Sequence, residues 1–151
     1  MLQRIQTIFL LLASACMLAA VATPLSTFTY QGDTVVFEAM GMYKNDNLTD
    51  STWGLFALGI ISSIASLITV FLYKQRVLQI RLSVMNIIVM VGFYLFFGYL
   101  IYSVYSTEAL TFQKIGIGLI MPIVAIILTY LAIRRIAADE ALVRSLNRLR
   151  R

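Results

Sequence analysis

Apolar residues dominate four long stretches of this chain, and charged residues are confined to short islands between them. A bilayer core about 30 Å thick is crossed by roughly 20 helical residues that rise about 1.5 Å each. The charge-free runs, each of which contains an apolar stretch of that length, are Ile5 to Gly32, Ser51 to Tyr73, Leu82 to Thr107 and Ile115 to Ile133. The pattern therefore predicts four transmembrane helices over about 5–24, 53–73, 82–104 and 115–133.

The composition supports one membrane domain. The chain has 151 residues, of which 60% are hydrophobic and 13% are charged. So few polar residues cannot cover the surface of a soluble globule, and the bilayer must cover the rest. We predict a single integral membrane domain over 1–151 of the all-α class, with four helices running up-down-up-down and a helical extension at the carboxyl end.

Charge divides the extramembrane segments into two groups. The amino end, the second connection and the tail together hold ten basic and two acidic residues, a net charge of +8. The first and third connections hold two basic and five acidic residues, a net charge of −3. Because Lys and Arg resist translocation, we expect both termini in the cytoplasm and the connections around Asp33 and Glu108 outside it.

The connection between the first two spans carries a strand-like pattern. Residues 26–30 (Ser-Thr-Phe-Thr-Tyr) alternate polar and aromatic side chains, Gln31-Gly32-Asp33 favours a turn, and residues 34–38 are β-branched and aromatic. We predict a small extracytoplasmic β-hairpin, which must pack on the outer rim of the bundle or on a partner, because two strands alone are marginally stable. Met40 to Thr52 is rich in Asn and Asp, and we interpret it as a polar connection without strands.

Several residues inside the spans favour close helix packing. Small side chains recur at a spacing of four in the second span, where they let another helix approach, inside the bundle or in a neighbouring subunit. Asn86 is the most polar side chain in a span and is expected to bond a neighbouring helix, whereas Pro122 is expected to kink the fourth span. The small residues are Gly59, Ser62, Ser63 and Ser66.

Nothing in the sequence points to a catalytic, cofactor or metal site. His is absent, which removes the commonest general base and metal ligand, and no charged residue falls in the centre of a span, where ion-coupled carriers place one. Cys16 is the single cysteine and cannot form an intramolecular disulfide. Residues 11–16 loosely resemble a lipoprotein signal, but the apolar run continues past Cys16 to Ala22, so a packed helical cysteine is the better interpretation.

The tail over 134–151 contains good helix formers without Gly or Pro, and we expect it to continue the fourth helix. Leu142, Leu146 and Leu149 would share one face of that helix. Two interpretations stay open: the tail is only a positive-inside anchor, or it docks on anionic lipid or on an acidic partner. The candidate contact residues are Arg134, Arg135, Arg144, Arg148, Arg150 and Arg151.

Both ends of the chain carry a family resemblance. The start over 1–8 (Met-Leu-Gln-Arg-Ile-Gln-Thr-Ile) and the tail over 138–150 (Ala-Asp-Glu-Ala-Leu-Val-Arg-Ser-Leu-Asn-Arg-Leu-Arg) resemble those of a family of small four-span inner-membrane proteins from Bacteroidota, known as a domain of unknown function. The resemblance implies a bacterial inner-membrane location and a cytoplasmic tail, and brings no activity, ligand or catalytic residue. Asn147 stands where the usual form has an Asp, so no charge pair is carried over there.

Taken together, these patterns favour a non-enzymatic membrane subunit or assembly factor that docks through its basic tail. A protein-export complex is one conceivable setting, in which nucleic acid would be met only indirectly, through a ribosome. The alternatives are an oligomeric small-molecule channel or transporter, and a lipid-modifying enzyme. The expected partners are the bilayer and another membrane protein or complex, with no small-molecule substrate evident.

Overall fold

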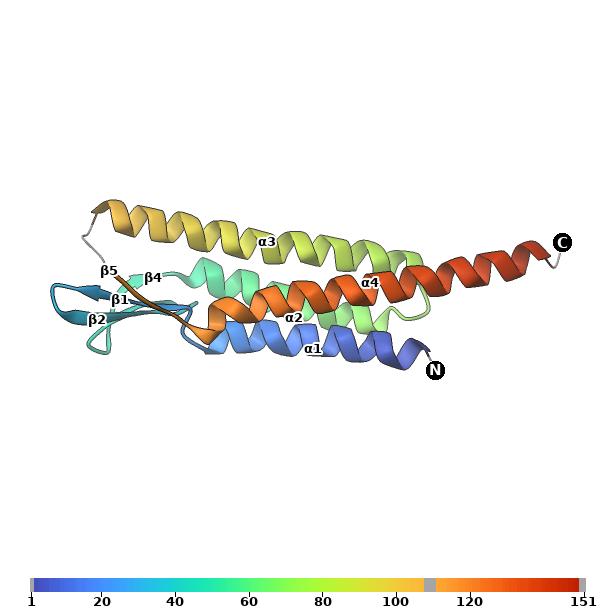
Figure 1. The fold of residues 1–151 in the computed structure, drawn as a ribbon, viewed down its shortest axis with the longest axis horizontal. Helices are drawn as coiled ribbons and strands as arrows, with labels where there is room; N and C mark the ends of the chain where they lie inside the picture. Colours follow the sequence, from blue (N-terminus) through green and yellow to red (C-terminus); the bar gives the residue numbers. More distant parts are fainter. Residues whose placement is uncertain (1, 108–110, 150–151) are drawn as a thin grey trace.

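Four long helices make up most of the molecule (Figure 1). The computed structural model describes residues 2–107 and 111–149, and within them every one of the four helices is long and apolar enough to cross a membrane. The prediction of four membrane-spanning helices is confirmed to that extent. The helices are α1 (Leu2–Ala22), α2 (Trp53–Phe71), α3 (Arg76–Thr107) and α4 (Ile117–Leu149).

The helices pack as a ring in which each contacts its neighbours in sequence, and α1 closes the ring against α4. Successive helices run in opposite directions, so both chain ends lie at one end of the bundle, which we call the tail end (Figure 1). A core at mid-height is built from small and flexible side chains, which allow the helices to approach closely. Its buried members are Ala13, Met17, Met90 and Ala125.

The opposite end of the bundle, which we call the sheet end, carries five strands within the described residues. Four lie between α1 and α2, namely β1 (Ser26–Tyr30), β2 (Asp33–Phe37), β3 (Gly41–Lys44) and β4 (Asn47–Ser51), and β5 (Thr111–Ile115) lies between α3 and α4. They form one antiparallel sheet in the order β4-β3-β2-β1-β5. The predicted all-α class with one small hairpin is therefore wrong.

Two tight turns explain why the first connection becomes a meander. Gln31 and Gly32 have φ angles of 51° and 91°, and Asn45 and Asp46 have φ angles of 48° and 64°. Two-residue loops with both central residues at positive φ match the twist of paired strands, and Gly, Asn and Asp tolerate that backbone best. The second of these loops joins β3 to β4, so the interpretation of Met40 to Thr52 as a strandless connection is also wrong.

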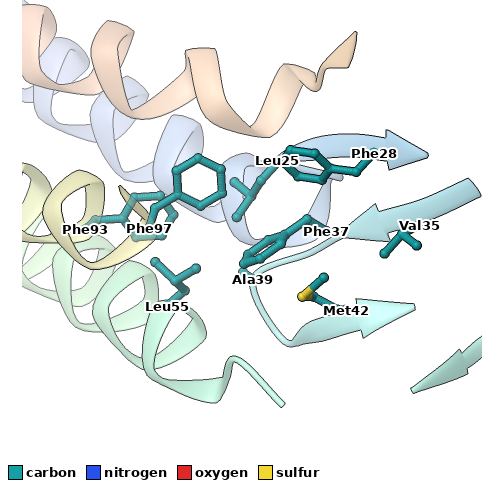
Figure 2. Close-up of a cluster of buried hydrophobic side chains, with 9 residues drawn as sticks. All are labelled: Leu25, Phe28, Val35, Phe37, Ala39, Met42, Leu55, Phe93 and Phe97. Carbon is teal, nitrogen blue, oxygen red and sulfur yellow. The ribbon is translucent and has the colours of Figure 1, made fainter. Parts of the chain in front are cut away.

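The sheet is held to the bundle by a second apolar core (Figure 2). Phe37 of β2 meets Phe97 of α3 edge to face, with ring centroids 5.2 Å apart. Leu55 at the start of α2 and Phe93 of α3 are fully buried in the same cluster. Aromatic burial of this size stabilises a sheet that would otherwise be marginal, so the sheet and the helices share one core.

The segment that joins α1 to β1 lies in close backbone contact with the segment that joins β5 to α4. The Gly116 amide donates to the Leu25 carbonyl at 2.9 Å, and the Gly118 amide donates to the Pro24 carbonyl at 3.2 Å. A Cβ atom on Gly116 would overlap the Pro24 carbonyl, so only glycine fits without a shift of backbone. This contact fixes the start of α4 against the end of α1.

Candidate functional site

A pair of serines joins α1 to α2. The hydroxyls of Ser14 and Ser63 lie 2.8 Å apart, and each hydroxyl also reaches the backbone carbonyl of the other serine, at 3.2 and 3.3 Å. Both side chains are buried. Because a hydroxyl buried in a bilayer has no water to bond, reciprocal pairing of this kind holds two helices in register.

A second polar contact joins α2 to α3. The Ser62 hydroxyl donates to Asn86 Oδ1 at 2.8 Å, and Asn86 Nδ2 donates to the Ser66 hydroxyl at 2.7 Å. All three side chains are buried. The amide thus has both its acceptor and its donor occupied by one neighbouring helix, which is the arrangement expected of a structural asparagine.

The other two packing candidates lie nearer the sheet end. Gly59 is buried against α1, and a Cβ atom there would meet the Val21 side chain. Pro122 lies buried inside α4, where its ring nitrogen cannot donate to the carbonyl one turn earlier. One turn away, the Tyr94 hydroxyl of α3 donates to the Leu119 carbonyl at 2.5 Å and ties α3 to the first turn of α4. The structure therefore places these residues between helices, as it does the small residues of α2.

At the tail end, α4 continues well beyond the other helices (Figure 1). Ile136 is the last fully buried side chain of this helix, and every side chain from Ala141 to Arg148, which we call the projecting segment, is exposed. Leu142 and Leu146 are 57% and 65% exposed on this segment. Two leucines four residues apart lie on one helix face, so the segment presents an uncovered apolar stripe.

The arginines of the tail occupy different surroundings. Arg134 and Arg135 are exposed near the end of the bundle, and Arg144 bonds Glu140 through Nε and Oε1 at 3.0 Å, one helical turn away. Arg148 lies one turn further along the exposed segment. Arg150 and Arg151 lie outside the described residues. The four candidate contact residues within the described part of the tail therefore do not form one cluster.

An ion pair that the sequence analysis did not single out joins α3 to α4. Arg76 Nη2 lies 3.3 Å from Asp139 Oδ2, and Arg76 Nη1 donates to the Asp139 carbonyl at 3.4 Å. The two side chains are only 25% and 17% exposed. A half-buried two-point contact of arginine is a stronger tie than an exposed pair, so it fixes the base of the projecting segment against the start of α3.

Beside this ion pair lies an open groove of about 620 Å³. Its walls come from the turn between α2 and α3, the first turns of α3, and the base of the projecting segment. Both basic and apolar side chains line it, and the linear sequence does not reveal this grouping because the two sides are some 60 residues apart. The lining residues are Lys74, Gln75, Arg76, Val77, Leu78, Arg81, Glu140 and Val143.

The described part of the chain contains no group of three or more His, Cys, Asp or Glu residues placed to hold a metal ion. A family model described as a domain of unknown function (DUF4293) matches residues 2–149. No curated protein and no solved structure matches the chain.

Proposed function

Since this chain belongs to the DUF4293 family of domains of unknown function, which supplies no activity to test, we propose from the geometry that it is a membrane-anchored docking subunit or assembly factor. In this proposal the chain does no chemistry of its own. It lies in the bacterial inner membrane with both termini in the cytoplasm, and the projecting segment binds a cytoplasmic partner of a larger complex.

The distribution of charge supports that orientation. The three segments with a net charge of +8 meet at the tail end, and the two connections with a net charge of −3 meet in the sheet. Positive segments are retained on the cytoplasmic side of a bacterial inner membrane, so the sheet would face the other side.

Cysteine labelling tests the orientation. In a Cys16→Ser background, which leaves the chain without other thiols, we expect Asn47→Cys in β4 to react with an impermeant thiol reagent in intact cells. Gln75→Cys, in the turn at the tail end, should react only after the cells are opened. Both positions are exposed, so access to the thiol is limited by the membrane and not by packing. Labelling of Gln75→Cys alone in intact cells would reverse the proposed orientation.

The exposed leucines of the projecting segment carry the proposal of a docking function. A positive-inside anchor needs only basic residues close to the membrane, such as Arg134 and Arg135. The helix instead continues for more than two further turns and keeps Leu142 and Leu146 uncovered between Glu140 and Arg148. This segment continues the axis of a span away from the bundle (Figure 1), so in this proposal its exposed leucines contact a partner in the aqueous phase and not the acyl chains.

The buried polar side chains favour this function over a transport pathway. Asn86 bonds both Ser62 and Ser66, and Ser14 bonds Ser63. Hydroxyl and amide groups that are satisfied between helices stabilise packing, whereas a solute path would need such groups to face open space.

Copurification from native membranes tests the docking function. We expect Leu142→Gln/Leu146→Gln to lower recovery of the partner roughly 30-fold, which is the loss typical of a single interface hot spot. Arg144→Ala/Arg148→Ala should cause a comparable loss, and Arg144→Lys/Arg148→Lys should lose the partner too if the arginines bind carboxylates in bidentate fashion.

All variants are compared at equal abundance in the membrane, with Ile64→Leu on the exposed side of α2 as the matched control. Unchanged recovery of every partner by the leucine, alanine and lysine variants would show that the segment is only an anchor.

A further inference from the structure

The groove at the tail end has the chemistry of a phosphate site. Lys74, Arg76 and Arg81 line it from the α2–α3 turn and the start of α3. Arg76 is held by Asp139, and Glu140, the acidic lining residue, is paired with Arg144. Among the described residues no carboxylate forms an ion pair with Lys74 or Arg81. The groove therefore presents two cations whose charge is not neutralised by the protein.

Neighbouring aromatic residues place this groove at the level of the lipid headgroups. Phe71 and Tyr73, at the end of α2, are 78% and 52% exposed, directly before Lys74. Exposed aromatic side chains at the end of a membrane-spanning helix mark the boundary between the acyl chains and the headgroups. In a membrane, this boundary would bring Lys74 and Arg81 to the level of the lipid phosphodiesters.

Apolar side chains line the groove between its cations. Val77 and Leu78 are exposed on the first turns of α3, after Lys74 and before Arg81, and the charge-free run of α3 starts at Leu82. A ligand that joins a phosphate to an apolar group would use both kinds of side chain, whereas inorganic phosphate would use only the cations. Basic pockets between helices at a membrane face bind anionic headgroups in this way.

We propose that this groove is a binding site for the headgroup phosphate of an anionic membrane lipid. Lys74 and Arg81 contact the phosphate, Arg76 holds the wall of the groove through Asp139, and Val77 and Leu78 contact the apolar part of the headgroup region between the two cations. The site adjoins the projecting segment through Val143 but can be tested separately from the docking function, because Leu142 and Leu146 are not among the residues that line the groove.

Native mass spectrometry of the purified full chain in detergent tests the site. The chain is titrated with phosphatidylglycerol and, separately, with phosphatidylcholine of the same acyl chains. We expect the anionic lipid to bind preferentially, and Lys74→Gln/Arg81→Gln to weaken it roughly 25-fold, at about fivefold for each basic residue. Both side chains are exposed, so their replacement should leave the melting temperature unchanged.

Arg134→Gln/Arg135→Gln is the matched control, since it removes two charges from the same end of the molecule outside the groove. We expect it to bind phosphatidylglycerol almost as the unmodified chain does. An equal loss in both double variants would show general charge attraction and overturn the site. Displacement of the lipid by inorganic phosphate at equal concentration would assign the groove to a soluble phosphate, and equal binding of the two lipids would also overturn the proposal.

Glu140→Gln is expected to raise the affinity for phosphatidylglycerol, whereas Lys74→Gln/Arg81→Gln lowers it. Removing this negative charge from the lining should strengthen phosphatidylglycerol binding, because Glu140 repels the phosphate and partly neutralises Arg144. A variant that merely damaged the groove would weaken binding, so a decrease would contradict the proposed contact between the headgroup and this wall.

Discussion

Gly116→Ala is expected to lower the free energy of unfolding by about 3 kcal/mol, the upper part of the range for overpacking a closely fitted site. The added Cβ would overlap the Pro24 carbonyl, and backbone atoms cannot move aside as a flexible side chain can. The hydrogen bond from the Gly116 amide to the Leu25 carbonyl would be strained as well. Thermal unfolding in detergent, followed by circular dichroism, measures the effect.

Gly98→Ala is the control for this experiment. Gly98 is exposed in the interior of α3, and a Cβ atom there meets nothing within 4 Å. Because glycine is a poorer helix former than alanine, this variant should be slightly more stable, by up to about 1 kcal/mol. A Gly116→Ala protein that unfolds at the same temperature as Gly98→Ala would show that α1 and α4 do not contact each other as described.

Ser63→Leu is expected to destabilise the bundle by about 2–3 kcal/mol, whereas Ile64→Leu should have little effect. Ser63 is buried at the contact with α1, where leucine would push the helices apart and remove the hydroxyl that bonds the Ser14 hydroxyl. Ile64, the next residue, is half exposed on the side of α2 away from this contact, and its replacement conserves volume.

The two variants are compared in the same detergent by thermal unfolding. Equal melting temperatures would mean that Ser63 does not lie at a close helix crossing. The pair is informative because the positions are adjacent in sequence and differ in which way they face.

The helices could be predicted because their signal is local. A bilayer requires about 20 apolar residues in a row, and charge marks the ends of each run. The helices extend beyond the predicted spans: α3 begins at Arg76, six residues before the predicted span, and reaches Thr107. Arg76 and Arg81 are tolerated there because a helix can continue past the apolar layer once its charged side chains reach the headgroups.

The sheet was underestimated because its pairing is not local. β5 is short, exposed on every side chain, and lies between two spans, and its partner β1 is some 85 residues earlier in the chain. No hydrophobic run in the sequence predicts such a strand. The β3–β4 hairpin did leave a signal, since Asn45-Asp46 is a favourable pair for a two-residue turn, but the surrounding Asn and Asp residues also suit an irregular loop.

The candidate binding residues were accessible from sequence only in part. The exposed leucines of the tail follow from helical periodicity. The groove does not follow from the sequence. Lys74 lies in the α2–α3 turn and Arg81 in α3, whereas Glu140 and Val143 lie in α4, and only the packing of α3 on α4 brings them together. From the sequence alone, the charges of Lys74 and Arg81 indicate only the orientation of the chain in the membrane.

The pairing of β1 with β5 also determines when the sheet can be completed during synthesis. Synthesis proceeds from the amino end, so α1, the β1–β4 meander and α2 exist before α3 has emerged. Until Thr111–Ile115 reaches the same side of the membrane, β1 is an edge strand with one row of backbone groups unpaired. A ribosome that stalls within α3 would therefore leave in the membrane an intermediate whose β1 backbone is uncovered, and the arrival of the last strand covers β1 and makes β5 the edge of the sheet in its place.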